Sequence, residues 1–234
     1  MGLLLSGARE PSAWVRRWSH LVKAGSSVLD VACGSGRHMA WFAGLGCQVT
    51  GLDSSPEAVV AASAYGTCLK ADIENAAWPL LDAGQPRKFD VVVVTNYLWR
   101  PLFPTLLASL APGGLLLYET FAMGNETLGK PTRPDFLLQP GELLRVCAGL
   151  EVVAYEAGFL SNPARVVQRI GAASPLIAFA PHSLEYRANP GASAQDDLSD
   201  PPHYRQHCCP DHPNVAQRRR GLPGIATIHR LAHH

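Results

Sequence analysis

Short apolar runs alternate with segments of helical periodicity between about residue 26 and residue 171. Val91–Val94 is apolar at every position, which is typical of a central strand in a parallel sheet covered on both faces. This alternation predicts a doubly wound α/β fold. The predicted strands are Ser27–Ala32, Gln48–Asp53, Cys68–Ala71, Phe89–Thr95 and Leu115–Thr120, and the predicted helices are Arg37–Leu45, Pro56–Ala64, Arg100–Leu110 and Pro140–Cys147.

The pattern changes at both ends of this core. Downstream, GLEVVAYEAGFL and ARVVQRIGA are joined by the turn Ser161–Asn162–Pro163, which predicts an antiparallel hairpin at one sheet edge. Upstream, Pro11–Ala24 has helical spacing with Ser12 as its N-cap, and it either packs against the sheet or covers a ligand site as a lid. We expect an N-terminal helix or lid in residues 1–25, the core domain in 26–174 and a poorly structured tail, rich in proline and histidine, in 175–234.

Composition narrows the class of protein. The chain of 234 residues has a formal net charge of +1, which argues against a broad electrostatic surface for nucleic acid or anionic lipid. Its six cysteines are scattered without a CxxC pair, as in reduced cytosolic proteins. No apolar segment approaches the length of a membrane span. We expect a cytoplasmic protein without membrane contact, a monomer or homodimer, for which a nucleic-acid partner is disfavoured.

The stretch VLDVACGSGRH places a glycine-rich turn between a predicted strand and a predicted helix, where backbone N–H groups can face a ligand. A Walker A phosphate loop is absent, and no small residue follows Gly34 and Gly36 at the third position of the dinucleotide fingerprint. Asp30 would repel a pyrophosphate but would favour a cationic ligand, and it could also brace the loop. The loop therefore favours a positively charged nucleoside and disfavours an NAD oxidoreductase.

The same stretch resembles motif I of class I S-adenosylmethionine-dependent methyltransferases. Asp30 takes the acidic position, Gly34 and Gly36 take the last two glycines, and Ala32 replaces the first. Four later segments resemble the family's other motifs in the expected order: VTGLDSS, CLKADIENAAWPL, FDVVVVTNYLWRPLFP and LAPGGLLLYETF. The resemblance implies a Rossmann-like, mostly parallel seven-stranded sheet with a C-terminal antiparallel hairpin. It also implies S-adenosyl-L-methionine as the methyl donor.

The resemblance assigns donor-binding roles to residues of these motifs. Asp53 lies 19 residues after Gly34, close to the spacing of about 20 for an acid that binds ribose hydroxyls, although NAD uses the same spacing. Asp72 is expected at the adenine amino group, with Ile73 on the ring. The complete expected set is Asp30, Ala32, Gly34, Gly36, Asp53, Ser54, Asp72, Ile73 and Asn96. Each acid also has a structural alternative, namely a loop brace for Asp30, a solvated strand end for Asp53 and an N-cap for Asp72.

Methyl transfer to a sulfonium donor needs mainly the positioning of an acceptor, and a general base only where the acceptor must lose a proton. The catalytic candidates are Tyr97, after the fourth strand, and Glu119, at the end of the fifth. The sequence TNYL lacks the prolines of the N-P-P-Y/F motif, which disfavours methylation of amino groups on nucleobases or glutamine. Arg100 either binds an anionic substrate or faces solvent.

A segment of roughly twenty residues without clear periodicity follows the fifth strand, and loops of this length are often functional. We expect a substrate lid with Asn125, Arg133 and Phe136 as contacts. This segment and PGELLRVCAGLEVVAYEAGF resemble the small bacterial tellurite-resistance and thiopurine-type methyltransferases, which act on small molecules. The resemblance implies in-line transfer of a methyl group to a small-molecule acceptor. The alternatives are an RNA or protein methyltransferase and a non-catalytic regulatory protein that binds the donor.

The tail contains one cluster of potential metal ligands. HYRQHCCPDH includes three histidines and the adjacent pair Cys208 and Cys209, but adjacent cysteines without C-x₂-C spacing are a poor zinc motif, so we expect no metal site. The basic run Arg218–Arg220 is expected to be a solvated charge run.

Overall fold

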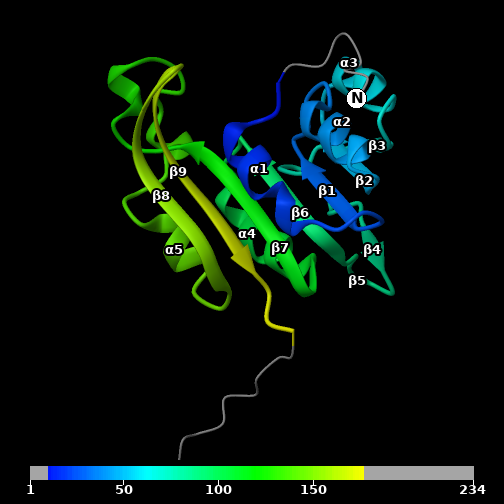
Figure 1. Ribbon diagram of the computed structural model, residues 1–234. Helices are drawn as coiled ribbons and strands as arrows, with labels where there is room; N and C mark the ends of the chain where they lie inside the picture. Colours follow the sequence, from blue (N-terminus) through cyan, green and yellow to red (C-terminus); the bar gives the residue numbers. More distant parts are fainter. Residues whose placement is uncertain (1–9, 177–234) are drawn as a thin grey trace, which may run out of the picture. The chain divides into compact units, whose positions relative to one another are not determined.

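The apolar runs of the sequence form one central sheet. The computed structural model describes residues 10–176, and its seven-stranded sheet has the order β3-β2-β1-β6-β7-β9-β8 (Figure 1). In this sheet, β3, β2, β1, β6 and β7 pair in parallel, whereas β9 runs antiparallel to both β7 and β8. The strands are β1 Ser27–Val31, β2 Gln48–Asp53, β3 Thr67–Lys70, β6 Phe89–Thr95, β7 Leu110–Phe121, β8 Glu151–Ser161 and β9 Ala164–Ala173. The predicted Rossmann-like fold with a C-terminal antiparallel hairpin is confirmed.

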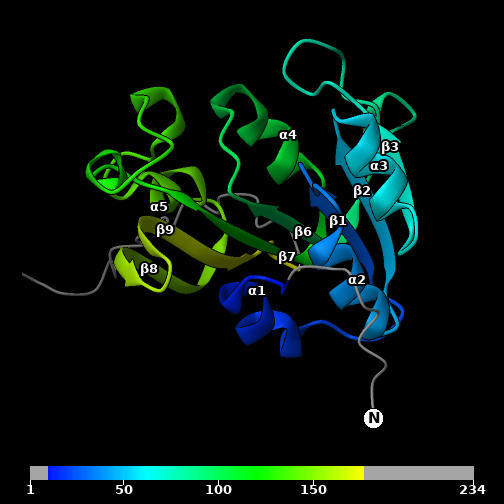
Figure 2. The same cartoon turned by 90° about the horizontal axis from the view of Figure 1, so that it is seen from above.

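Helices cover both faces of this sheet (Figure 2). Apolar side chains of α1, α2 and α3 share one buried cluster with β1, β2 and β6, and those of α4 and α5 share a second cluster with β1, β6 and β7. The helices are α1 Ala13–Trp18, α2 Arg37–Gly44, α3 Pro56–Ala62, α4 Phe103–Ala108 and α5 Glu142–Val146, and the short 3₁₀ helices are η1 Ser19–Leu21, η2 Arg100–Leu102, η3 Asn125–Thr127 and η4 Pro134–Phe136.

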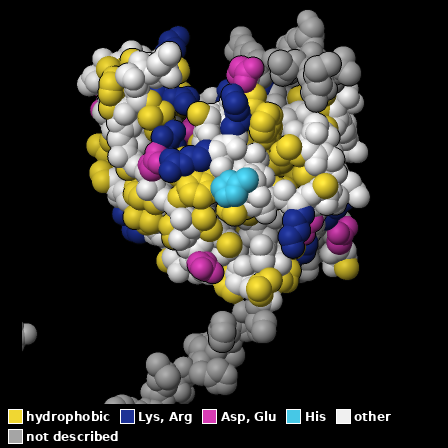
Figure 3. All heavy atoms as spheres, in the orientation of Figure 1, with side chains coloured by type: hydrophobic (Ala, Val, Ile, Leu, Met, Phe, Trp, Pro, Cys, Tyr) yellow, Lys and Arg dark blue, Asp and Glu magenta, His cyan; other side chains and the backbone are white. Residues whose placement is uncertain are grey.

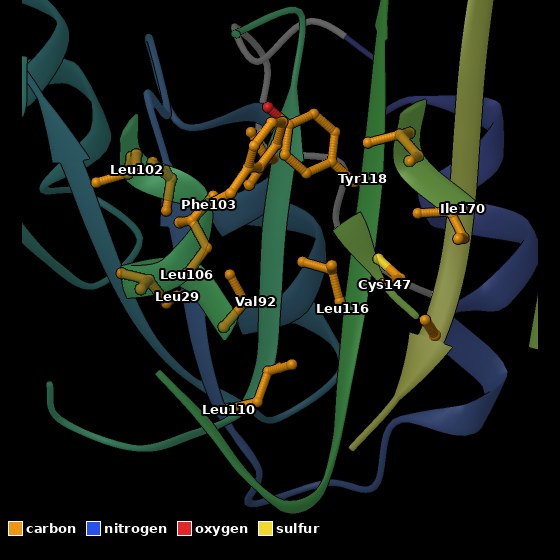
Figure 4. Packing of buried hydrophobic residues seen from close by; sticks show 14 of the residues in the cluster. Leu29, Val92, Leu102, Phe103, Leu106, Leu110, Leu116, Tyr118, Cys147 and Ile170 are labelled. Atoms are coloured by element: carbon orange, nitrogen blue, oxygen red, sulfur yellow. The ribbon is translucent and has the colours of Figure 1, made fainter. Parts of the chain in front are cut away.

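The two apolar clusters follow from the pleat of the strands, because neighbouring side chains point to opposite faces. Val92 and Leu116 face the cluster that contains α4, together with Tyr118 and Ile170 (Figure 4). Val93 and Leu117 belong to the other cluster, under α1 and α2. The apolar run in β6 is therefore buried on both faces, as its sequence predicts.

The N-terminal helix packs against the sheet. Ser12 is its N-cap, as predicted, and accepts a hydrogen bond from the Trp14 N–H. Trp14 is 1% exposed and donates its indole N–H to the Ile170 carbonyl. The predicted helix Pro11–Ala24 is shorter in the structure, because α1 gives way at Ser19 to a single 3₁₀ turn. Packing, one of the two expected roles of this segment, is thus present.

The sequence did not predict the segment between β3 and β6. It contains a two-stranded hairpin, β4 Leu81–Asp82 and β5 Gln85–Pro86, with positive φ at Ala83 and Gly84 in the turn. This pair of left-handed residues is the geometry that tight hairpins require. Between β3 and β6 the described chain has no helix.

The described residues end near the start of the expected tail. Only Pro175 and Leu176 of residues 175–234 are described, so the tail cysteines, histidines and arginines discussed above lie outside the described residues. Across residues 10–176, no helix has the length and apolar character needed to span a membrane. The same residues contain no group of three or more His, Cys, Asp or Glu side chains arranged to hold a metal ion.

Candidate active site at the carboxyl ends of the strands

A cleft of about 280 Å³ lies where β1, β2, β3 and β6 end. In sheets of this type, the carboxyl ends of the parallel strands are where ligands bind. The lining residues come from four separate segments of the chain and are Ala32, Asp53, Ser54, Ala71, Asp72, Ile73, Glu74 and Tyr97. Three of them are acidic and none is Lys or Arg, so the described wall of the cleft favours a cationic ligand.

The glycine-rich loop after β1 turns through left-handed backbone conformations. Ala32, Gly34 and Gly36 have φ values of 53°, 56° and 82°. Gly36 also lies against α3, since a Cβ at this position would be 2.9 Å from the Ala62 Cα. The loop is therefore held close to α3, and Ala32 lines the cleft.

Asp53 joins this loop to the end of β2. Its Oδ2 accepts a hydrogen bond of 2.8 Å from the Gly34 N–H, and its Oδ1 accepts one of 2.9 Å from the Ser55 N–H. The side chain is partly exposed and lines the cleft. A carboxylate in this position can accept further hydrogen bonds from ligand hydroxyl groups, because each oxygen has two acceptor sites.

Asp72 caps the turn after β3 and lines the cleft at the same time. Its Oδ1 accepts hydrogen bonds from the backbone N–H groups of Glu74 and Asn75, and the Asn75 side-chain amide donates to both oxygens. Hydrogen bonds from the Asn75 side chain and backbone lower the pKa of Asp72. The capping role considered from the sequence is present, and it holds the ionised carboxylate at the edge of the cleft.

Tyr97 contributes its ring to the cleft. Its hydroxyl is buried and lies close to the Glu74 carboxylate. Burial, followed by the nearby Glu74 carboxylate, raises the pKa of Tyr97, so the hydroxyl stays protonated at neutral pH. The preceding Asn96 is exposed, has a φ of 56° and donates its backbone N–H to the Glu119 carbonyl, but its side chain is not part of the cleft lining.

Glu119 and Asp30 lie outside the lining of this cleft, so the structure does not bring them together with the other expected site residues. Glu119 is 1% exposed on the sheet face covered by α1, where its carboxylate pairs with Arg165 at 3.2 Å and Arg169 at 3.5 Å. Charged side chains gather over β9 and α1 on the same face of the molecule (Figure 3). Asp30 is also 1% exposed, and its Oδ2 lies 3.8 Å from the Nδ1 of the buried His38. Both carboxylates are enclosed by protein.

Arg100 connects segments of the chain rather than facing a substrate. Its Nε and Nη2 donate to the two oxygens of Glu142, and its Nη1 and Nη2 also donate to the carbonyls of Asp135 and Leu137. Burial acts to raise the pKa of Glu142, but the hydrogen bonds from Arg100 and from the Gln139 N–H outweigh it and lower that pKa. The sequence predicted that Arg100 either binds a substrate or faces solvent. In the structure it instead holds α5 and the carbonyls of Asp135 and Leu137 to η2 as an internal clamp.

The predicted lid residues also divide into two kinds. Asn125 is 2% exposed, donates its side-chain amide to the carbonyls of Gly129 and Pro131, and accepts from the Val166 N–H. It therefore stabilises the loop from inside, which corrects its expected role as a substrate contact. Arg133 and Phe136 are exposed, and the guanidinium lies 5.2 Å from the ring centroid. Their role as substrate contacts stays a prediction.

Two lining residues were missed from the sequence, Ala71 and Glu74. Glu74 is two positions after Asp72, and the turn that Asp72 caps brings it to the same wall. The run DIE was the available signal, because it places a second acid two residues after Asp72 in the same turn.

Comparison with known proteins agrees with this fold and this loop. A family model described as "Methyltransferase domain" matches residues 28–114. The chain is 32% identical over 114 residues to a ubiquinone biosynthesis O-methyltransferase of Paraburkholderia phytofirmans, covering 46% of this chain and 48% of the relative. It is 35% identical over 115 residues to the protein of the same name from Burkholderia multivorans, covering 46% and 49%. The chain therefore spans about half the length of the curated relatives it matches.

Solved structures show the same architecture at low sequence identity. TehB from Haemophilus influenzae superimposes with a TM-score of 0.57 at 19% identity, covering 70% of this chain and 62% of TehB. The N-methyltransferase NodS from Bradyrhizobium japonicum gives a TM-score of 0.54 at 18% identity, covering 69% and 92%. At these identities the likeness concerns the fold alone.

Residues 28–114 thus match a family model described as a methyltransferase domain, and the described chain shares its fold with TehB and with the N-methyltransferase NodS. The resemblance identified from the motifs is confirmed for the domain and for the fold.

Proposed function

We propose that the protein is an enzyme that transfers a methyl group from S-adenosyl-L-methionine to a small-molecule acceptor. One observation carries the proposal: residues from four segments, Asp53 and Asp72 among them, meet in one cleft beside the left-handed glycine-rich loop. The names of the curated relatives support a small acceptor, since those proteins are O-methyltransferases of ubiquinone biosynthesis.

The residues of the cleft fit the donor. Gly36 has no space for a side chain, which keeps the loop backbone close to α3 and open towards the cleft. Asp53 is proposed to bind the ribose hydroxyls, Asp72 the adenine amino group, and Ile73 and Ser54 the adenosyl surface. When bound, the sulfonium donor supplies an activated methyl group, and the carbon–sulfur bond breaks as the acceptor atom bonds to the methyl carbon.

The protein's own contribution is then positioning and exclusion of water, which in favourable cases supply on the order of 7–11 kcal/mol. Tyr97 is proposed to position the acceptor through its ring, which lines the cleft, while its buried hydroxyl stays protonated and accepts no proton. A proton released by the acceptor therefore passes to another group or to water. Glu119 is not proposed as the base, because Arg165 and Arg169 hold its buried carboxylate.

Calorimetric titration with S-adenosylmethionine, S-adenosylhomocysteine and NAD tests the donor. We expect the two adenosyl compounds to bind and NAD not to bind. The variant Asp53→Asn removes a charged acceptor worth about 1.5–3 kcal/mol, so binding of both should weaken roughly 10- to 100-fold. Asp82→Asn, in β4 and outside the cleft lining, is the matched control and should bind as the wild type does.

Two results would contradict this proposal. NAD binding without S-adenosylhomocysteine binding would restore the dinucleotide alternative, and a loss of binding in Asp82→Asn equal to that in Asp53→Asn would show that the cleft is not the donor site. Thermal unfolding of both variants separates a binding defect from a folding defect. With the donor bound, transfer of a labelled methyl group to pooled hydroxyl- and amine-bearing metabolites tests turnover and identifies the acceptor.

A further inference from the structure

A second cleft, of about 200 Å³, adjoins the donor cleft. It lies between the turn after β3 and the start of α4, and Ile73 and Glu74 line both clefts. Polar atoms form the larger part of its exposed lining, although six of the eight lining side chains are apolar; the lining residues are Ile73, Glu74, Ala76, Trp78, Trp99, Pro101, Leu102 and Thr105. The proposed donor contacts Asp53 and Asp72 are absent from this lining, so the second cleft is a separate place for a ligand.

This cleft exists because the segment between β3 and β6 is built from turns and a short hairpin. After Ile73 the chain passes through the turn capped by Asp72 and reaches Trp78, which packs partly buried against the core below. The facing wall begins at Trp99, directly before η2, and it is also packed against that core. Two tryptophans from separate segments of the chain thus line the cleft and are held in place by packing against the protein interior.

The charge in the lining of this second cleft is negative. Glu74 is the only ionisable side chain in its lining, among the described residues, and its side chain is exposed. No salt bridge to Glu74 is present in the described part of the chain. A carboxylate beside aromatic faces is the combination that attracts a cation, because the ring faces carry negative potential and the carboxylate adds a full charge.

We propose that this second cleft binds the ammonium group of a small arylalkylamine, against Trp78 and Trp99 and beside Glu74. The proposal goes beyond methyl transfer, because it concerns a second ligand that sits next to the donor. Since Ile73 and Glu74 line both clefts, the two ligands are expected to be neighbours in a ternary complex rather than competitors.

Benzylamine and benzyl alcohol are suitable probes because they are alike in size, and only benzylamine is charged at neutral pH. Tryptophan fluorescence and calorimetry of the full chain should show benzylamine binding roughly three- to tenfold more tightly than benzyl alcohol. Glu74→Gln should remove most of this preference and leave benzyl alcohol binding unchanged. Trp99→Leu should weaken both probes, while Trp41→Leu, in α2 and outside both linings, serves as its control.

Equal binding of the two probes would overturn the proposal, as would benzylamine binding that is insensitive to both Glu74→Gln and Trp99→Leu. Saturating S-adenosylhomocysteine should change the benzylamine affinity less than twofold, and full competition would show that benzylamine occupies the donor cleft. The same titrations keep the two proposals apart. Benzylamine binding without S-adenosylhomocysteine binding refutes only the donor assignment, and the reverse result refutes only the amine site.

Discussion

Acidic side chains near the carboxyl edge of the sheet occupy two contrasting environments. Asp53 and Asp72 line the cleft at the strand ends, are at least partly exposed, and accept hydrogen bonds from backbone N–H groups and, at Asp72, also from the Asn75 side chain. Asp30 and Glu119 are 1% exposed under α1 and face a histidine and two arginines. The first pair retains acceptor capacity for a ligand, whereas the second pair is enclosed by protein partners.

This difference arises from the pleat of the sheet and from what covers each face. Tyr118 and Glu119 are neighbours in β7, yet Tyr118 packs in the cluster with α4 while Glu119 lies under α1. Ser12, at the start of α1, donates its hydroxyl to Glu119 and its backbone N–H to His38 Nε2. The N-terminal segment therefore encloses the buried pair. An acid at a strand end is a ligand-binding residue only when its face is left open.

The largest expected effect tests whether Glu119 is structural. Glu119→Gln leaves the largely buried Arg165 without its carboxylate partner and leaves Arg169 with Glu156 alone, and breaking a buried ion pair costs about 3–5 kcal/mol. Urea unfolding should therefore show a loss of stability of that size. S-adenosylhomocysteine binding by the folded variant should remain within about twofold of the wild type, because Glu119 is outside the cleft lining.

Glu156 offers a matched comparison, because it pairs with Arg17 and Arg169 but its side chain is 41% exposed. Exposed ion pairs contribute about 0–1 kcal/mol, so Glu156→Gln should be nearly as stable as the wild type. If instead Glu119→Gln were equally mild and abolished donor binding, Glu119 would belong with the cleft residues.

A second pair of variants tests the loop on the cleft side. Gly34 and Gly36 both have positive φ, so a change to Ala adds strain of about 1–2 kcal/mol at either position. At Gly36 the new Cβ would also overlap Ala62, and overpacking of this kind costs a further ~1–3 kcal/mol, whereas at Gly34 nothing lies within 4 Å. Gly36→Ala should therefore lower the free energy of unfolding more than Gly34→Ala, as urea titration would show. Equal losses would mean that α3 can move away from the loop.

The fold and most of the cleft were predictable from the sequence, because they rest on local patterns. The apolar run in β6 and the glycines after β1 each specify a conformation without reference to distant residues. Asp53, Asp72 and Tyr97 were found because they follow strands whose carboxyl ends meet at one edge.

The remaining assignments depended on contacts that the sequence does not specify. Glu119 meets Arg165 and Arg169 only after β9 has returned alongside β7, and Arg100 meets Glu142 across 42 residues. Asn125 was expected to be a lid contact because it lies in a long loop without periodicity. Its partners, the carbonyls of Gly129 and Pro131, are backbone groups, and the sequence does not show which backbone groups a side chain will meet. Partner choice over such distances decides whether a polar residue is structural.

The Arg100–Glu142 pair lies between the two environments, with side chains 36% and 12% exposed, and it gives the smallest expected effect. The folded-state pKa of Glu142 is lowered, with hydrogen bonds from Arg100 outweighing the opposing effect of burial. The ion pair should contribute about 1 kcal/mol to the free energy of unfolding, given this much exposure. This stabilisation is fully present above the unfolded-state pKa of about 4.3 and is lost as the pH falls through the lower folded-state pKa. The stability difference between wild type and Glu142→Gln should therefore shrink between pH 7 and pH 3 in urea titrations. Asp135→Asn, whose exposed side chain pairs with Arg133, is the control and should show almost no difference at any pH. A difference for Glu142→Gln that persists at pH 3 would mean that the clamp between η2 and α5 does not depend on the carboxylate charge.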